Sequence, residues 1–185
     1  MIVYLHGFNS SPQSHKAQVF GRYMAERGLQ HEYACPALPP EADAALAIVR
    51  RSIKGAKDVC YIGSSLGGFY ATHMVENHGG KAVLINPAID PHVGLRAYIG
   101  PQKNLYTGEA YELKEAHLEG WRRLYAPKVS PERYLLLVET GDEVLDYRRA
   151  VERYAGAEQV VVQGGDHTLQ SFPQHLPRIL KFAGY

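Results

Sequence analysis

A serine flanked by glycines, within residues 61–68, is the pattern in this sequence that most directly predicts chemistry. It reads Gly63-x-Ser65-x-Gly67, after a strand-like run at 58–62 and before a helix-like run at 69–76. A strand that turns directly into a helix crowds the backbone, so both flanking positions need glycine. The residue at such a corner is strained and its side chain is pushed outward. The sequence therefore predicts that the Ser65 hydroxyl is presented above the carboxyl end of a strand.

An acid and a histidine follow two later strand-like runs. Asp142 comes after the apolar run 134–139, and His167 comes after 159–162 and two glycines. A serine hydroxyl is a weak nucleophile at neutral pH and needs an adjacent base. A histidine can take its proton, and a carboxylate then holds the imidazole in the required tautomer. Ser65, Asp142 and His167 are therefore predicted to form a nucleophile, acid and base set.

Three other carboxylates compete with Asp142 for the role of the acid. Asp166 adjoins His167 in the chain, so its carboxylate is poorly placed to reach the ring Nδ1 of that residue. Asp146 begins a predicted helix, where a carboxylate is explained as an N-cap. Glu143 neighbours Asp142 and should point elsewhere. The sequence favours Asp142, which follows a strand and a glycine.

Six short apolar strands alternate with helices along the chain. The strands are expected at residues 2–6, 31–35, 58–62, 81–85, 134–139 and 159–162. The helices are expected from 11 or 14 to about 27, at 41–53, from the helix-like run at 69–76 up to the Gly79-Gly80 pair, and at 146–154 and 171–182. This alternation predicts an α/β fold with a six-stranded, mostly parallel sheet and helices on both faces. Active sites of such sheets lie at the carboxyl ends of the strands.

Residues 1–185 are predicted to form one domain, with a less regular insertion at about 88–130. We expect this insertion to contain helical fragments and to form a cap or lid over the site. Its aromatic residues Tyr98, Tyr106 and Trp121 are candidates for lining an acyl pocket. The alternative is that these side chains simply cover the sheet.

The order nucleophile, acid, histidine resembles that of the α/β-hydrolase superfamily. Over essentially its whole length the chain is similar to the small YqiA-type esterases, through His6-Gly7-Phe8-Asn9-Ser10-Ser11-Pro12, Gly63-Ser64-Ser65-Leu66-Gly67-Gly68, Asn86-Pro87-Ala88 and Gly165-Asp166-His167. The resemblance implies an α/β-hydrolase fold with strand order 2-1-3-4-5-6 and activity on acyl esters or thioesters. It also implies an oxyanion hole made by the backbone N–H groups of Phe8 and Leu66. His6 is expected to bond its ring to the loop backbone.

The composition is that of an ordinary globular protein. The formal net charge is +1, so no large field favours nucleic acid or an anionic membrane. No apolar run approaches the length of a membrane span, and we expect no secretory signal. Cys35 and Cys60 are interpreted as small buried hydrophobic residues, which favours a cytoplasmic enzyme. No metal site or cofactor motif is predicted, and the oligomeric state is left open.

Three functions remain compatible with these residues. The leading prediction is a serine esterase or thioesterase that forms an acyl-enzyme on Ser65. An amide or peptide hydrolase could use the same three residues. A protein that binds ligands on a hydrolase scaffold without catalysis is the third possibility.

Overall fold

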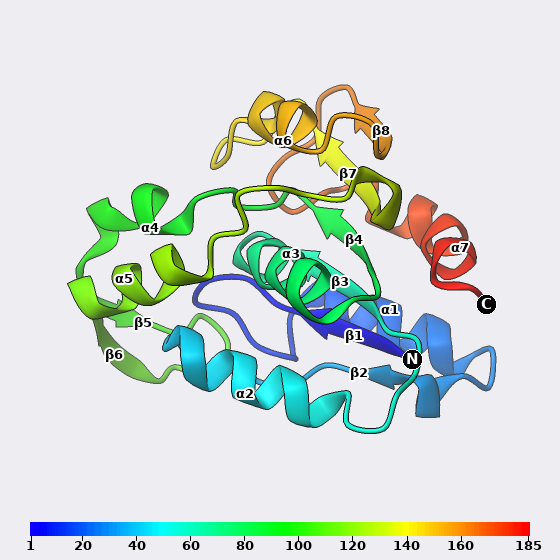
Figure 1. Cartoon of the computed structure of the whole chain (residues 1–185), viewed down its shortest axis with the longest axis horizontal. Helices are drawn as coiled ribbons and strands as arrows, with labels where there is room; N and C mark the ends of the chain where they lie inside the picture. The colour runs from blue at the N-terminus through cyan, green and yellow to red at the C-terminus, as the bar shows by residue number, and fades with distance from the viewer.

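The computed structural model describes all 185 residues and is built around one six-stranded sheet (Figure 1). Its strands are β1 (Ile2–Leu5), β2 (Tyr33–Ala34), β3 (Cys60–Ser64), β4 (Lys81–Ile85), β7 (Tyr134–Glu139) and β8 (Glu158–Val162). They are ordered β2-β1-β3-β4-β7-β8, and every neighbouring pair is parallel. This confirms the predicted strand order and places the carboxyl ends of all six strands at one edge.

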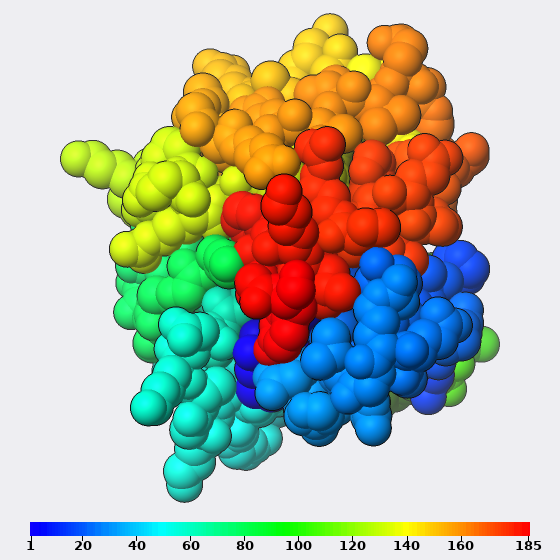
Figure 2. Space-filling model, turned by 90° about the vertical axis from the view of Figure 1, so that its right-hand side faces the viewer, coloured from blue at the N-terminus to red at the C-terminus, as the bar shows by residue number.

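Helices α1 (His15–Ala25) and α7 (Phe172–Ala183) cover one face of the sheet. Because side chains alternate along a strand, Ile2 and Tyr4 point to this face. The two helices come from opposite ends of the chain, yet they are in contact. In Figure 2 the red C-terminal segment lies against the blue N-terminal one. The first and last helices thus close the same layer.

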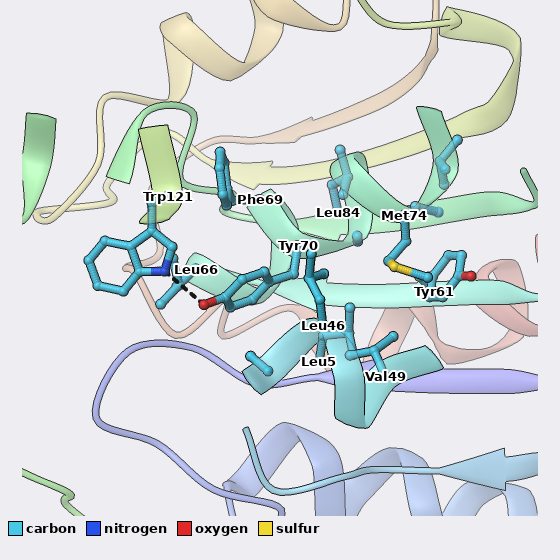
Figure 3. Close-up of a cluster of buried hydrophobic side chains, with 14 of the residues drawn as sticks. Leu5, Leu46, Val49, Tyr61, Leu66, Phe69, Tyr70, Met74, Leu84 and Trp121 are labelled. Carbon is cyan, nitrogen blue, oxygen red and sulfur yellow. Dashed lines mark hydrogen bonds between the residues drawn. The ribbon is translucent and has the colours of Figure 1, made fainter. Parts of the chain in front are cut away.

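The opposite face is covered by α2 (Ala42–Ser52), α3 (Leu66–His78) and α6 (Tyr147–Arg153), with α5 (Glu115–Leu124) at its edge. Figure 3 shows part of this core, in which Trp121 of α5 donates a hydrogen bond from Nε1 to the hydroxyl of Tyr70 at 2.7 Å. Trp121 is fully buried. A buried indole of this kind contributes about 3–5 kcal/mol relative to alanine, so α5 is firmly attached to the sheet layer.

The segment 88–130 contains more than the helical fragments that the sequence predicts. Besides α4 (Pro91–Gly94), the 3₁₀ turn η2 (Arg96–Tyr98) and α5, it holds an antiparallel hairpin of β5 (Gly100–Lys103) and β6 (Ala110–Leu113). Glycine and proline begin β5, and both are rare in strands. The sequence does not predict this hairpin, because the hydrogen bonds that join it to the loop at Asn9 and Ser10 come from residues far away in the chain.

Two predicted strands differ from the observed ones by more than one residue at an end. The predicted strand 31–35 is reduced to two residues, because η1 (Gln30–Glu32) forms a 3₁₀ turn first. The predicted strand 58–62 begins later and extends through Ser64, directly before Ser65. A last 3₁₀ turn, η3 (Pro131–Arg133), leads into β7. No helix is both long enough and apolar enough to cross a bilayer.

Candidate active site

Ser65 stands alone between β3 and α3, in a backbone conformation that side chains rarely adopt. Its φ is 53° and its ψ is −121°. A Cβ added to Gly63 would overlap the carbonyl group of Gly67, and one added to Gly67 would overlap that of Leu5. These contacts confirm that the corner needs glycine at both positions. The strained turn leaves the Ser65 side chain partly accessible at the carboxyl edge of the sheet.

The loops after β7 and β8 bring Asp142 and His167 together. The Nδ1 of His167 lies 2.8 Å from Oδ2 and 3.0 Å from Oδ1 of Asp142. Oδ1 also accepts the backbone N–H groups of Val144 at 2.9 Å and Leu145 at 2.8 Å. The carboxylate is 1% exposed, whereas the His167 side chain is 21% exposed. The Asp142 carboxylate is thus fixed against Nδ1 of the His167 ring, and the Nε2 of that ring remains free to face Ser65.

The three competing carboxylates have other partners. Asp146 caps α6 by accepting the N–H of Arg148 at 3.1 Å. Asp166 accepts hydrogen bonds from the backbone and hydroxyl of Thr168. Glu143 accepts the backbone N–H of His167 at 3.0 Å but forms no hydrogen bond with its ring. Asp142 alone pairs with the His167 imidazole.

Ser65 and His167 both line each of two adjoining cavities. No hydrogen bond joins the Ser65 hydroxyl to the His167 ring in this structure. Hydrogen bonds between a nucleophile and its base are often long without substrate and tighten when it binds. The two side chains therefore face the same space, into which a reacting carbonyl group could be placed.

The two cavities differ in character. One, called here the apolar cavity, has a volume of about 290 Å³. Half of its lining residues are hydrophobic, among them Phe8, Leu66, Pro87, Ile89, Leu95, Tyr98, Val144 and Leu145, and its walls also include Asp90, Asp146 and Arg149. The other has a volume of about 530 Å³ and is more polar; its walls include His6, Ser10, Ser14, His15, Lys16, Tyr106, Thr168 and Gln170. Burial lowers the pKa of Lys16 to about 8, while the nearby Asp166 acts in the opposite direction. Ser65, Phe8 and His167 form the boundary between them.

The three aromatic residues predicted for the pocket have different positions. Tyr98 lines the apolar cavity and Tyr106 lines the polar one. Trp121 lines neither, so that expectation is wrong for this residue. Its indole is fully buried, bonded to Tyr70, and packed edge-on against Phe8 with ring centroids 6.4 Å apart. Trp121 therefore supports the wall of the site from behind.

The backbone N–H groups of Phe8 and Leu66 have no hydrogen-bond partner in the structure. Both residues line the apolar cavity beside Ser65. A Cβ on Gly7 would stand 3.2 Å from the Ser65 Cβ, so glycine allows this loop to approach closely. These two N–H groups are available for a developing negative charge next to the Ser65 hydroxyl.

His6 holds the loop that carries Phe8. Its Nε2 accepts the backbone N–H of Leu38 at 3.0 Å, so its Nδ1 carries the proton and donates to the carbonyl oxygen of Gly7 at 3.1 Å. Burial lowers the pKa of His6, which favours this neutral ring. The contacts agree with the structural role expected from the sequence.

The hairpin β5–β6 is tied to the same loop, which the sequence did not indicate. Asn9 donates to Gln102 at 2.9 Å and accepts from the Tyr111 hydroxyl at 2.7 Å. Asn104 donates to the carbonyl oxygen of Ser10 at 2.7 Å. About ninety or more residues separate these partners in the chain, so no local pattern could reveal them. The hairpin and the Phe8 loop form one wall.

Asn86 is a further residue of the site, for which the sequence predicts no role. Its Nδ2 donates to the carbonyl oxygens of Asp166 and His167, each at 3.1 Å, and its Oδ1 accepts the N–H of Glu139 at 3.1 Å. Its φ is 39°. The sequence signal for this residue was an Asn-Pro pair directly after a strand.

No group of three potential metal ligands occurs in the structure.

The fold and the position of Ser65 at the strand-to-helix turn define the α/β-hydrolase class. The structure is similar to mouse alpha/beta hydrolase domain-containing protein 10, with a TM-score of 0.72 at 14% identity over 97% of this chain and 87% of that one. The chain belongs to the uncharacterised protein family UPF0227, whose model matches residues 1–184. These findings confirm the resemblance stated from the sequence.

Two esterase structures share the fold. Est1E from Butyrivibrio proteoclasticus matches with a TM-score of 0.66 at 15% identity, covering 98% of this chain and 85% of that one. The esterase domain of a Rhodothermus marinus protein matches with a TM-score of 0.65 at 18% identity, covering 97% and 83%. At these identities the likeness establishes the fold.

Proposed function

We propose that this protein is a serine hydrolase of carboxylic esters or thioesters. The observation that carries the proposal is the buried Asp142 carboxylate on Nδ1 of His167, with Ser65 on the same cavity wall. The esterases among the proteins of similar fold support the same reaction class. Ser65 is the nucleophile, His167 the general base, and Asp142 the residue that orients the ring.

In the proposed reaction, Ser65 Oγ attacks the carbonyl carbon while Nε2 of His167 takes the hydroxyl proton. The negative charge on the carbonyl oxygen is stabilised by the N–H groups of Phe8 and Leu66. The bond to the leaving group then breaks, and His167 donates the proton to the departing alcohol or thiol. Water, activated by the same ring, hydrolyses the acyl-enzyme and releases the acid.

The two cavities suggest how an ester lies in the site. The acyl group occupies the apolar cavity, since half of the residues that line it are hydrophobic, against a third in the other cavity. The alcohol or thiol side extends into the polar cavity, where side chains can hydrogen-bond it. Residues 88–130 form a cap that contributes Tyr98 to the first cavity and Tyr106 to the second.

A fluorophosphonate probe tests the proposal, because it reacts with an activated serine. We expect the wild-type protein to be labelled at Ser65, and Ser65→Ala to remain unlabelled. A panel of esters, thioesters and amides of graded acyl length then measures the substrate class. Absence of labelling and of turnover on the whole panel would refute the hydrolase proposal, and a clear preference for amides would refute the ester class.

A further inference from the structure

A second carboxylate, that of Glu139, lies beneath the loop that carries His167. Glu139 ends β7 and is 1% exposed. Its Oε2 accepts the backbone N–H groups of Asp166 and Gln170, both at 2.9 Å. Its Oε1 accepts the N–H of Ser171 at 2.8 Å and the Ser171 hydroxyl at 2.6 Å. All four donors belong to residues 166–171, on both sides of His167.

The Glu139 carboxylate is stabilised by hydrogen bonds from this loop and not by a cationic side chain. No Lys, Arg or His forms an ion pair with it. Burial acts to raise the pKa of Glu139, but the hydrogen bonds from Ser171, Asp166 and Gln170 outweigh it and hold the pKa below its usual range. A buried carboxylate without such donors would be strongly unfavourable. The loop and the carboxylate therefore stabilise one another in a single arrangement.

The contact also sets the backbone immediately before His167. A Cβ on Gly165 would overlap the Glu139 carboxylate, and Gly165 has a φ of 69°. In addition, the Nδ2 of Asn86 donates to the carbonyl oxygens of Asp166 and His167, while its Oδ1 accepts the N–H of Glu139. The backbone before and after the His167 ring is thus fixed by hydrogen bonds to Glu139 and Asn86.

We propose that Glu139 is a positioning residue for His167. This proposal rests on the function proposed above, in which the imidazole of His167 must bind Asp142 through Nδ1 and face Ser65 through Nε2. Glu139 touches neither the ring nor the substrate; it acts through the loop backbone. Displacing a catalytic group by about 1 Å can cost about a hundredfold in rate, so a fixed loop matters for turnover.

Glu139→Gln tests this role, because the side chain keeps its size but one oxygen becomes an NH₂ group that cannot accept. Glu76→Gln is the matched control. Glu76 of α3 accepts hydrogen bonds from the N–H and hydroxyl of Ser130 and from the hydroxyl of Tyr134, at the opposite end of β7. We expect both variants to lower the melting temperature, but only Glu139→Gln to lower kcat, by about a hundredfold, with KM nearly unchanged.

A spectroscopic readout separates this proposal from the proposed function. The Nδ1 proton shared with a carboxylate gives a proton NMR resonance at low field, which Asp142→Asn identifies by removing it. We expect the resonance to persist in Glu76→Gln and to broaden or disappear in Glu139→Gln. This measurement needs no substrate, so it remains decisive even if the wild-type protein hydrolyses no ester.

A Glu139→Gln protein that keeps both the resonance and the kcat of Glu76→Gln would overturn the proposal, because Glu139 would then only stabilise the fold. If Glu139→Gln does not fold, Ser171→Ala removes a single one of the four hydrogen bonds. A kcat below that of Glu76→Gln, with a weakened resonance, supports the proposal in that variant. Unchanged values for both overturn it.

Discussion

At the scale of single residues, the catalytic acid is the one of four nearby carboxylates whose side chain points to the His167 ring, and this is Asp142. Asp142→Asn should keep the fold, since an amide has the same shape and can still accept the N–H groups of Val144 and Leu145. It should lower kcat by about ten-thousandfold, because the His167 ring loses control of its tautomer, as in the corresponding serine protease variant. Steady-state kinetics on an activated ester measures this.

Asp146→Asn is the control for this prediction. Asp146 caps α6 and makes no hydrogen bond to His167, although it also lines the apolar cavity. Weakening the cap should cost up to about 1 kcal/mol in the free energy of unfolding and leave the rate almost unchanged. A reversed pattern in the two variants would assign the acid to Asp146.

Adjacent serines give a second comparison at this scale. Ser65→Ala should abolish hydrolysis, with a loss of up to about a millionfold, because the nucleophile is removed. Ser64 is the last residue of β3 and is buried, so Ser64→Ala should retain most activity. Titration of the active sites with a fluorophosphonate quantifies both. Activity that survives in Ser65→Ala and is lost in Ser64→Ala would move the nucleophile by one residue.

At the scale of elements, the turn between β3 and α3 depends on the space beside Gly67. Gly67→Ala should destabilise the protein by about 1–3 kcal/mol or more, because the added methyl group meets the backbone of Leu5 on β1. Gly94→Ala is the control, since no atom lies within 4 Å of its added Cβ. Its effect should stay within about 0.5 kcal/mol. Urea unfolding of both variants checks the difference, and equal losses would contradict it.

The cap provides a second prediction for an element. Tyr98 lines the apolar cavity from η2, and its ring packs edge-on against Phe8 with centroids 6.2 Å apart. Tyr98→Ala should enlarge this cavity and shift the preferred acyl chain toward greater length, with little change in stability because Tyr98 is 50% exposed. Val93 on α4 is also exposed but lines neither cavity, so Val93→Ala should leave the preference unchanged. An unshifted preference in Tyr98→Ala would remove Tyr98 from the acyl pocket.

At the scale of the whole molecule, buried tyrosines link stability to alkaline pH. Burial raises the pKa of Tyr61 and Tyr154 to about 12, from the ordinary 10.0, and raises that of Tyr4 as well. Below pH 10 these phenols are protonated in both the folded and the unfolded chain, so their contribution is fully present. Above pH 10 the unfolded chain releases protons that the folded chain retains. The free energy of unfolding therefore falls, by about 1.4 kcal/mol per pH unit for each such group.

Absorbance of the phenolate ion measures this effect. All thirteen tyrosines should titrate near pH 10 in concentrated urea, whereas fewer should do so in the native protein. The remainder should titrate only as the protein unfolds. A native titration in which all thirteen ionise together, before any loss of structure, would contradict the predicted link.

Much of the fold could be predicted because its information is local. The strand positions 81–85 and 134–139 were correct to the residue, since continuous apolar runs bounded by turn residues have few other interpretations. The turn at Ser65 was also visible in adjacent residues, through its flanking glycines, although the backbone of Leu5 on β1 is what makes glycine necessary at position 67. The choice of Ser65, Asp142 and His167 as a set then followed from the rule that the active site of a parallel sheet lies at the carboxyl ends of its strands.

What the tertiary structure decided is everything that depends on partners distant in the chain. Trp121 looked like a pocket residue, but the hydroxyl of Tyr70 and the ring of Phe8 bind it in the core. The hairpin β5–β6 forms despite poor strand formers, and side-chain hydrogen bonds join it to the distant loop at Asn9 and Ser10. In the sequence, Glu139 is only the last residue of an apolar run. In the structure its carboxylate accepts four hydrogen bonds from residues 166–171. The physical reason is that side-chain donors and acceptors are satisfied in space, and spatial neighbours are set by the packing of the complete chain.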